Sequence, residues 1–286
     1  MSNIIEFRNV VKKYPNFSLN EINFDIPKGY ITGFIGPNGS GKTTSIKLLL
    51  SMAFRDAGEI YINDSLIEDN NYLSNIGIVM DDSFLMKDWY IKDISEIISP
   101  FFKAWDEDLF NNYLRRFNID KSYKVEELSK GMTIKLMLAT ALSHDAKLLI
   151  LDEPTSGLDP SSREEICDIL QEYVQDEDRS ILFSTHITAD LDAIADNIVF
   201  ILNGRIIFSG LKDELLAKYK LIKGGLDDLN DLNKSSLIGI KKTNYSFEAL
   251  VDHSLILENK EIIEESCSLE EIVLFFNREE KNEDNN

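Results

Sequence analysis

The residues with the clearest chemical potential form the segment Gly36-Pro37-Asn38-Gly39-Ser40-Gly41-Lys42-Thr43, which matches the pattern G-x-x-x-x-G-K-[ST]. Apolar residues 31–35 precede it as an expected strand, and residues 44–50 follow it as an expected helix. Glycine lets successive backbone N–H groups converge on one anion, and a helix N-terminus adds partial positive charge. The segment therefore predicts a phosphate cradle in which Lys42 reaches the β- and γ-phosphates and the Thr43 hydroxyl ligates Mg²⁺. For the motif alone, the alternative is an ordinary glycine-rich turn.

Two acidic residues, Asp152 and Glu153, directly follow the apolar run Leu148-Leu149-Ile150-Leu151. Such a continuous run indicates a strand buried on both faces, as in a parallel sheet covered by helices. Hydrolysis of a nucleoside triphosphate needs a metal holder and a group that acts on the attacking water. Asp152 is placed to hold Mg²⁺ through water, and Glu153 is placed to polarise the attacking water. The alternative is that the two acids only cap a loop.

The elements around these residues predict an α/β domain over residues 1–216. Alternating apolar residues predict antiparallel strands at 4–10 and 17–26, and three-to-four spacing predicts a helical insertion at about 84–142. Asn203-Gly204 is the favoured two-residue turn between strands at 198–202 and 205–208. Further strands are expected at 59–63, 76–80 and 180–184.

The remaining chain predicts a small α+β appendage at 217–277. Its expected elements are strands at 237–240 and 254–257 and a helix at 269–277, which the capping box Ser268-x-x-Glu271 announces. Residues 278–286 are charged and polar, and we expect a frayed tail there.

Composition limits the classes of function. The 286 residues carry a formal net charge of −20, which argues against a nucleic-acid partner because binding to nucleic acid requires a concentrated basic face. Cys167 and Cys267 lie far apart, so neither a disulfide framework nor a metal site is expected. No segment approaches the roughly 18 consecutive apolar residues of a membrane helix. Work at a membrane would therefore require another chain to supply the span.

Six motifs, in this order and spacing, resemble those of the nucleotide-binding subunits of ATP-binding cassette (ABC) transporters, over about residues 3–215. They are Tyr14, Gly36 to Thr43, Leu128-Ser129-Lys130-Gly131-Met132, Leu148 to Glu153, Ser156 to Asp159, and Ser184-Thr185-His186. The resemblance implies a P-loop NTPase fold with a mixed sheet core, an antiparallel β subdomain and a helical insertion. It also implies hydrolysis of ATP with Mg²⁺, and it places Thr44 with the cradle among the nucleotide-binding residues.

The same resemblance assigns roles to residues outside the cradle. It implies that Tyr14 stacks on adenine and that His186 contacts the γ-phosphate. It also implies that Asp159 couples two sites across a dimer, and that Ser129 with Gly131 closes over the γ-phosphate bound to the partner subunit. The last role agrees with the sequence, because Ser129 can cap a helix that begins near Gly131, and such a helix end attracts anions.

The sequence departs from the family pattern in two motifs. Asp81 stands where these proteins usually carry glutamine; it is shorter and charged, so it is a candidate Mg²⁺ ligand that would add repulsion against the phosphates. The usual Leu-Ser-Gly-Gly-Gln reads Leu-Ser-Lys-Gly-Met here, so Lys130 adds a cation near the expected γ-phosphate position and Met132 lacks an amide. These departures bear on turnover and on the symmetry of the two subunits rather than on nucleotide binding.

Within the family, the appendage is similar to that of ATPases from exporters of bacitracin-type antibiotics and of phenol-soluble modulin peptides. The segments concerned are 223–225, 238–240, 247–250 and 268–272. The implied protein is a cytoplasmic ATPase, peripheral on the inner face of the cell membrane. It would pair with a second ABC ATPase, identical or a paralogue, and drive a separate transmembrane permease, a short helix of which would dock on residues 81–105.

Two other classes of function stay open at this point. One is an ATP-driven regulator of a membrane complex that moves no cargo. The other is a cassette protein that acts on ribosomes or DNA. Ribosomal versions normally place two cassettes in one chain and DNA versions insert long coiled coils, and this sequence has neither feature.

Overall fold

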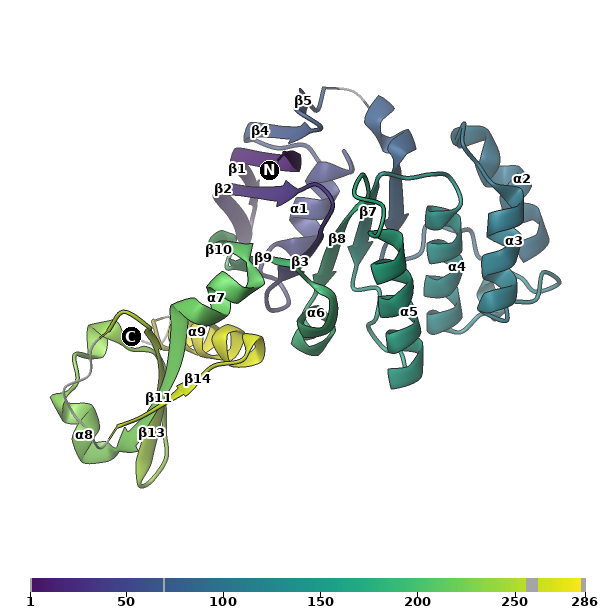
Figure 1. The fold of residues 1–286 in the computed structure, drawn as a ribbon. Coiled ribbons are helices and arrows are strands. Elements are labelled where there is room, and N and C mark those ends of the chain that lie inside the picture. The colour runs from purple at the N-terminus through teal and green to yellow at the C-terminus, as the bar shows by residue number, and fades with distance from the viewer. Residues whose placement is uncertain (1, 69, 256–261, 284–286) are drawn as a thin grey trace. The chain divides into compact units, whose positions relative to one another are not determined.

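A computed structural model describes residues 2–68, 70–255 and 262–283 of the chain (Figure 1). Contacts within the chain divide it into two compact units, Met1–Ser209 and Gly210–Asn286, and each is described by itself. The division lies just before residue 216, where the sequence placed the domain boundary.

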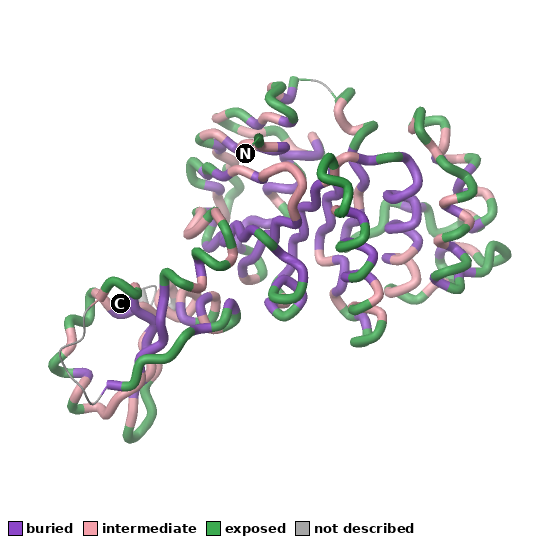
Figure 2. Tube along the Cα trace, in the orientation of Figure 1, coloured by how far each residue is buried: buried purple, intermediate pink, exposed green. Residues whose placement is uncertain are grey.

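The core of the first unit is a sheet whose strand order is β10-β9-β3-β8-β7-β6. Its strands are β3 (Ile31–Ile35), β6 (Ile76–Val79), β7 (Leu148–Asp152), β8 (Ser180–Thr185), β9 (Asn197–Leu202) and β10 (Arg205–Leu211). Every residue of β3, β7, β8 and β9 is buried, as Figure 2 shows, which confirms the prediction of strands covered on both faces. Since β3, β8 and β7 are parallel neighbours, the segments that follow them meet at one edge of the sheet.

A second, antiparallel sheet has the order β2-β1-β4-β5 and confirms the expected antiparallel subdomain. Its strands are β1 (Asn3–Tyr14), β2 (Phe17–Pro27), β4 (Ala57–Ile62) and β5 (Ser65–Leu66). Phe24 stacks on Phe7 at 4.3 Å between ring centroids and lies 5.5 Å from Phe34 of β3. The two sheets therefore share one hydrophobic core.

Helices flank the first sheet, and several lie between β6 and β7, where the sequence predicted a helical insertion. The α-helices are α1 (Lys42–Leu49), α2 (Ile94–Ile98), α3 (Glu107–Arg116), α4 (Lys130–Leu142), α5 (Pro160–Tyr173) and α6 (Thr188–Ile194). Short 3₁₀ helices are η1 (Asn71–Asn75), η2 (Ile91–Asp93), η3 (Ser99–Phe101) and η4 (Val125–Glu127). α4 packs on β6 and α3. Within the part of the chain that the structure describes, no helix combines the length and apolarity needed to cross a bilayer.

The second unit is an antiparallel sheet of order β12-β13-β11-β14 with helices. Its elements are α7 (Lys212–Lys218), β11 (Tyr219–Gly225), α8 (Leu226–Asp231), η5 (Lys234–Ser236), β12 (Ile238–Lys242), β13 (Ser246–Asp252), β14 (Ile263–Ser266) and α9 (Leu269–Glu283). The amide N–H of Ser268 donates to Glu271 Oε2 at 2.8 Å and that of Glu271 donates to Ser268 Oγ at 3.2 Å, so the predicted capping box is present.

Two expectations for this unit differ from the structure. α9 continues to Glu283, so the first part of the tail expected to fray from residue 278 is helical. Ser254 and Leu255 lie outside any strand, and residues 256 and 257 of that expected strand lie outside the described residues. The Asp252 carboxylate accepts a hydrogen bond from the amide N–H of Ser254 at 2.9 Å, which favours a turn over a continued strand.

Candidate active site

The segment Gly36–Thr43 joins β3 to α1, and its backbone requires glycine. Gly39 and Gly41 have φ values of +81° and +118°, which residues with a side chain rarely adopt. A Cβ on Gly36 would lie 2.2 Å from the carbonyl oxygen of Ile201. Around Gly39, by contrast, no atom lies within 4 Å of an added Cβ, so the segment is packed at its base and open at its tip.

The open tip has the donors that a phosphate needs. Ser40 Oγ is buried and has no hydrogen-bond partner among the described residues. The first turn of α1 contains no acidic residue, so its positive end is not neutralised locally. Asn38 is exposed, and Thr44 is half-buried in the first turn of α1. The segment therefore fits a phosphate group.

Lys42 is buried at the base of this segment, with 5% of its surface exposed. Its Nζ donates to the carbonyl oxygens of Gly36 at 2.7 Å and Pro37 at 3.4 Å, and lies 3.6 Å from Glu153 Oε1. Burial lowers the pKa of Lys42, whereas the carboxylates of Glu153 and Asp152 act to raise it. The ammonium group of Lys42 is therefore held by two backbone carbonyls and Glu153, and phosphate oxygens can take the place of these partners.

Asp152 forms a polar centre with two hydroxyl groups. Its Oδ2 accepts from Thr43 Oγ1 and its Oδ1 from Ser184 Oγ, each at 2.9 Å. Burial raises the pKa of Asp152, and these two hydrogen bonds oppose that rise. A hydroxyl and a carboxylate fit Mg²⁺, which keeps few protein ligands and otherwise binds phosphate oxygens and water. Among the described residues, no group of three or more His, Cys, Asp or Glu side chains suits a metal ion.

Ser184 is a contributor to this centre that the sequence analysis did not assign. It lies directly opposite Asp152 in the pairing of β7 with β8. The available signal was that each residue ends an apolar strand, but the adjacency of those two strands is a property of the folded sheet.

Glu153 lies between Lys42 and His186. Its Oε2 is 2.8 Å from Nδ1 of His186 and 3.4 Å from Thr185 Oγ1, and its amide N–H donates to the carbonyl of Ser184 at 2.9 Å. The backbone of Glu153 has a φ of +53°, a conformation that a residue with a side chain adopts at some energetic cost and that is common at functional sites. The structure thus brings together the three residues predicted to be catalytic.

Tyr14 lines a small pocket beside the cradle. The pocket has a volume of about 420 Å³ and is lined by Tyr14, Pro15, Asn16, Phe17, Ser18 and Asn203. Its position follows from two contacts: the Phe17 ring lies 3.0 Å from a Cβ built on Gly41, and the amide N–H of Gly204 donates to the Ser40 carbonyl at 2.8 Å. Tyr14 is 43% exposed, and an exposed aromatic ring is suited to stack on a planar group.

The residues predicted to act across a dimer lie on two other helix ends. Ser129 Oγ accepts from the Met132 amide at 3.2 Å and caps α4, as expected. Asp159 caps α5 by accepting from the Ser162 amide at 3.1 Å, and this hydrogen bond lowers the pKa of Asp159. Among the described residues, no hydrogen bond or ion pair connects Ser129 or Asp159 to the cradle segment. Within one copy of the chain, the described contacts therefore do not connect these two helix N-termini to the cradle.

Among the described residues, no hydrogen bond connects Asp81 to Thr43 or Asp152. The Asp81 carboxylate accepts a hydrogen bond from Lys130 Nζ at 2.6 Å. Asp81 and Lys130, two of the three residues that depart from the family pattern, are thus direct partners.

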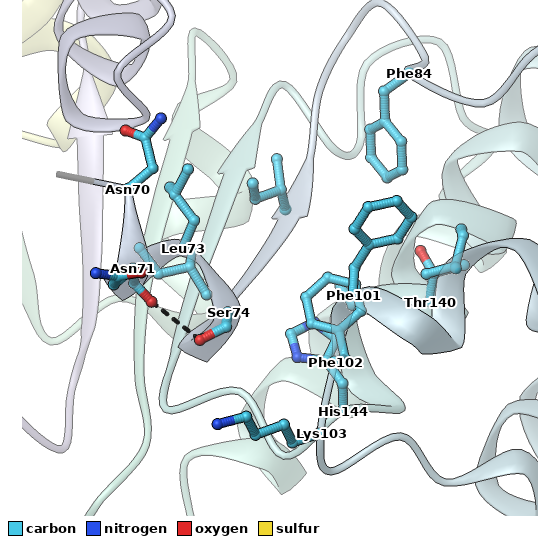
Figure 3. A pocket seen from close by; sticks show the side chains of 14 residues that line it. Asn70, Asn71, Leu73, Ser74, Phe84, Phe101, Phe102, Lys103, Thr140 and His144 are labelled. Atoms are coloured by element: carbon cyan, nitrogen blue, oxygen red, sulfur yellow. Dashed lines mark hydrogen bonds between the residues drawn. The ribbon is translucent and has the colours of Figure 1, made fainter.

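An apolar pocket of about 680 Å³ lies between the Asn70–Ser74 segment and the helical insertion (Figure 3). Figure 3 shows the rings of Phe84, Phe101 and Phe102 along one side of it, with the Asn70–Ser74 segment opposite. Phe101 is 74% exposed and Phe84 is 48% exposed. His144 stacks on Phe102 with 3.9 Å between ring centroids, and burial lowers the pKa of His144 to about 4.

The fold and these groups define a P-loop nucleotide-binding ATPase domain. Residues 19–156 match the family described as ABC transporter, and the chain belongs to this family as an ATP-binding subunit. Proteins of this family hydrolyse ATP, so the chain is an ATPase.

Several known proteins are similar to the chain. The lantibiotic transport ATP-binding protein SrtF of Streptococcus pyogenes is 33% identical, over 71% of this chain and 89% of SrtF. The Nod factor export ATP-binding protein I of Burkholderia orbicola is 32% identical, over 74% of this chain and 72% of that protein. The zinc import ATP-binding protein ZnuC of Rickettsia conorii is 34% identical, over 74% of this chain and 88% of ZnuC. A solved ATP-binding subunit of an ABC transporter is 25% identical, with a TM-score of 0.67, and the match covers 74% of this chain and 91% of that one.

Proposed function

We propose that this ATPase drives a bacterial exporter of antimicrobial or cytolytic peptides and hydrolyses Mg-ATP between two cassettes. The observation that carries the proposal is the position of Glu153, which contacts both Lys42 in the cradle and His186 after β8. A carboxylate held by two groups at a phosphate site is suited to act on an attacking water.

The cradle residues would bind the triphosphate. Lys42 Nζ exchanges the carbonyl of Gly36 for phosphate oxygens, and the buried Ser40 hydroxyl gains the partner that it lacks. Mg²⁺ at Thr43 and Asp152 would neutralise charge that develops on the phosphates. Tyr14 would stack on adenine, and Thr44 would support the phosphates from the first turn of α1.

Glu153 and His186 would act on the reaction itself. Once Lys42 turns to the phosphates, Glu153 keeps His186 as its partner and accepts a hydrogen bond from the attacking water. His186 is exposed, so its ring would be accessible to the γ-phosphate. In this proposal a base would act on the water and a second polar group would contact the phosphate.

A second cassette would complete the site. Ser129 and Gly131 lie on the exposed first turn of α4, and a serine-capped helix end attracts an anion. The γ-phosphate held by the cradle of a second subunit would supply that anion, with Asp159 near the junction of the two copies. Nucleotide then favours the closed pair, and hydrolysis releases it.

The apolar pocket would take a short helix of the permease. Exposed phenylalanines are unusual on a free surface and typical of a groove that receives an amphipathic helix. Phe84 lies three residues after Asp81, so a helix seated there contacts the loop that leads back to the carboxyl edge of the sheet.

The exporter assignment draws on SrtF, whose name specifies lantibiotic transport, and on the tail similarity to peptide-exporter ATPases. It is tested by co-expressing the chain with its permease and measuring ATP-dependent peptide uptake into inverted vesicles. Uptake that disappears in Glu153→Gln supports export. Stable assembly with ATPase activity but no uptake of any peptide would instead support a regulator.

A simpler measurement tests the paired site. The rate of Mg-ATP hydrolysis by the purified chain is measured against its own concentration, with Glu153→Gln as the control. A rate that rises faster than linearly and vanishes in the variant supports a homodimer. ATP binding without turnover would indicate that a paralogous ATPase or the permease has to be added.

A further inference from the structure

A salt bridge connects two parts of the first unit that are distant in sequence. Lys130 Nζ donates to Asp81 Oδ1 at 2.6 Å, across a sequence separation of 49. Both side chains are about half exposed, so the contact forms at the surface. One residue follows β6, and the other is the first residue of α4.

The sheet register explains what Asp81 brings to this contact. In the parallel pairing of β6 with β7, Val79 lies opposite Leu151. Asp81 and Glu153 are each two residues further along the chain, so both lie just beyond the carboxyl ends of these neighbouring strands. Asp81 therefore adds a third carboxylate to an edge that already carries Asp152 and Glu153. The pair with Lys130 compensates this charge and directs the Asp81 carboxylate to α4.

Lys130 lies at a position that is electrostatically unfavourable for a lysine. It occupies the first turn of α4, where the positive end of the helix disfavours a cation. The Asp81 carboxylate offsets this cost by accepting a hydrogen bond from the ammonium group at 2.6 Å. The two charges therefore support each other at a position where a lysine without a partner would be unfavourable.

We propose that Lys130 is a positioning residue that holds Asp81, and that their pair sets the position of the first turn of α4 relative to the carboxyl edge of the sheet. This inference rests on the proposed function, in which a second cassette closes over that turn. Asp81 is then a tether and not a metal ligand. Because Phe84 is three residues further on and lines the apolar pocket, the tether also connects the pocket to the edge.

Amide hydrogen exchange of segments 81–90 and 128–134 tests the tether without measuring turnover. We expect Asp81→Ala and Lys130→Ala each to speed exchange in both segments about two- to fivefold, the effect of losing an exposed ion pair. Lys130→Arg should keep the wild-type rates, and the exchanged pair Asp81→Lys with Lys130→Asp should restore them. Lys223→Ala, which breaks a 2.7 Å pair with Glu265 in the second unit, is the control and should leave both segments unchanged.

Binding of a fluorescent ATP analogue, titrated with Mg²⁺ in the same variants, separates the possible outcomes. Unchanged exchange in both alanine variants overturns the tether. So does a loss of Mg²⁺-dependent binding in Asp81→Ala that Lys130→Ala does not share, because Asp81 would then be a metal ligand. If the wild-type chain binds no ATP but the alanine variants still show the expected faster exchange, the proposed function is contradicted and the tether is supported.

Discussion

Glu153 Oε2 lies 2.8 Å from Nδ1 of His186, and this contact orients the carboxylate beside the cradle. Glu153→Gln keeps the size of the side chain and removes its charge and basicity. We expect the variant to lose turnover by at least about 100-fold, the usual contribution of a general base, while it still binds ATP.

The expected product of Glu153→Gln is a stable ATP-bound dimer, because closure no longer leads to hydrolysis. Light scattering after size exclusion with Mg-ATP measures it, alongside phosphate release. Glu172→Gln, at an exposed position on α5, serves as the control. A Glu153→Gln chain that stays monomeric at saturating Mg-ATP would speak against self-dimerisation.

Lys42→Ala should weaken ATP binding by about tenfold or more, since hydrogen bonds to charged groups contribute roughly 1.5–3 kcal/mol. Titration of a fluorescent ATP analogue gives the dissociation constant. Lys47→Ala, later in α1, is the matched control and should bind normally. Equal affinities for Lys42→Ala and wild type would remove Lys42 from the phosphate site.

Ser184→Ala removes one of the two hydroxyl donors to Asp152. We expect the Mg²⁺ concentration for half-maximal ATPase activity to rise about tenfold, as is usual when a group that orients a metal ligand is lost. Thr140→Ala, a change at another buried hydroxyl, which donates to the backbone carbonyl of Met137 at 2.7 Å, controls for general loosening. A normal Mg²⁺ requirement in Ser184→Ala would show that Thr43 alone orients Asp152.

Phe101→Glu should abolish assembly with the permease and leave the ATPase activity of the isolated chain unchanged. Phe101 is 74% exposed, so the folded unit loses little packing when it is replaced. Phe54→Glu is a matched control, because Phe54 is 84% exposed and does not line the pocket. Co-purification with tagged permease measures assembly; equal recovery of both variants would place the docking surface elsewhere.

His144 should make stability depend on pH. Burial lowers its pKa to about 4, below the value of about 6.5 for an unfolded histidine. The unfolded chain binds the proton more readily between these values, so stability is lost as pH falls from about 6.5 towards 4, at up to about 1.4 kcal/mol per unit.

Urea unfolding at pH 7 and pH 5 tests this dependence. His144→Phe keeps an aromatic ring against Phe102 and should lose about 2 kcal/mol less than wild type between the two pH values. His253→Phe, at an exposed position, should behave as wild type. Identical losses in His144→Phe and wild type would mean that His144 does not titrate in this range.

Local sequence determined much of this protein. A strand, a glycine loop and a helix are consecutive, so Gly36–Thr43 could be interpreted without knowledge of the fold. The caps at Ser129 and Ser268 act over three residues, and the Asn203-Gly204 turn acts over two, which is why each was predictable. The class of sheet followed from apolar runs such as Leu148–Leu151.

Tertiary structure decided the contacts between segments that are distant in the chain. The order β10-β9-β3-β8-β7-β6 differs from the order in sequence, and only this order places Ser184 opposite Asp152 and His186 against Glu153. The pair of Asp81 with Lys130, the aromatic pocket around Phe101 and the full length of α9 likewise depend on packing. A pattern in the sequence reports which face of an element is buried, whereas the neighbour that covers it is set by the free energy of the whole fold.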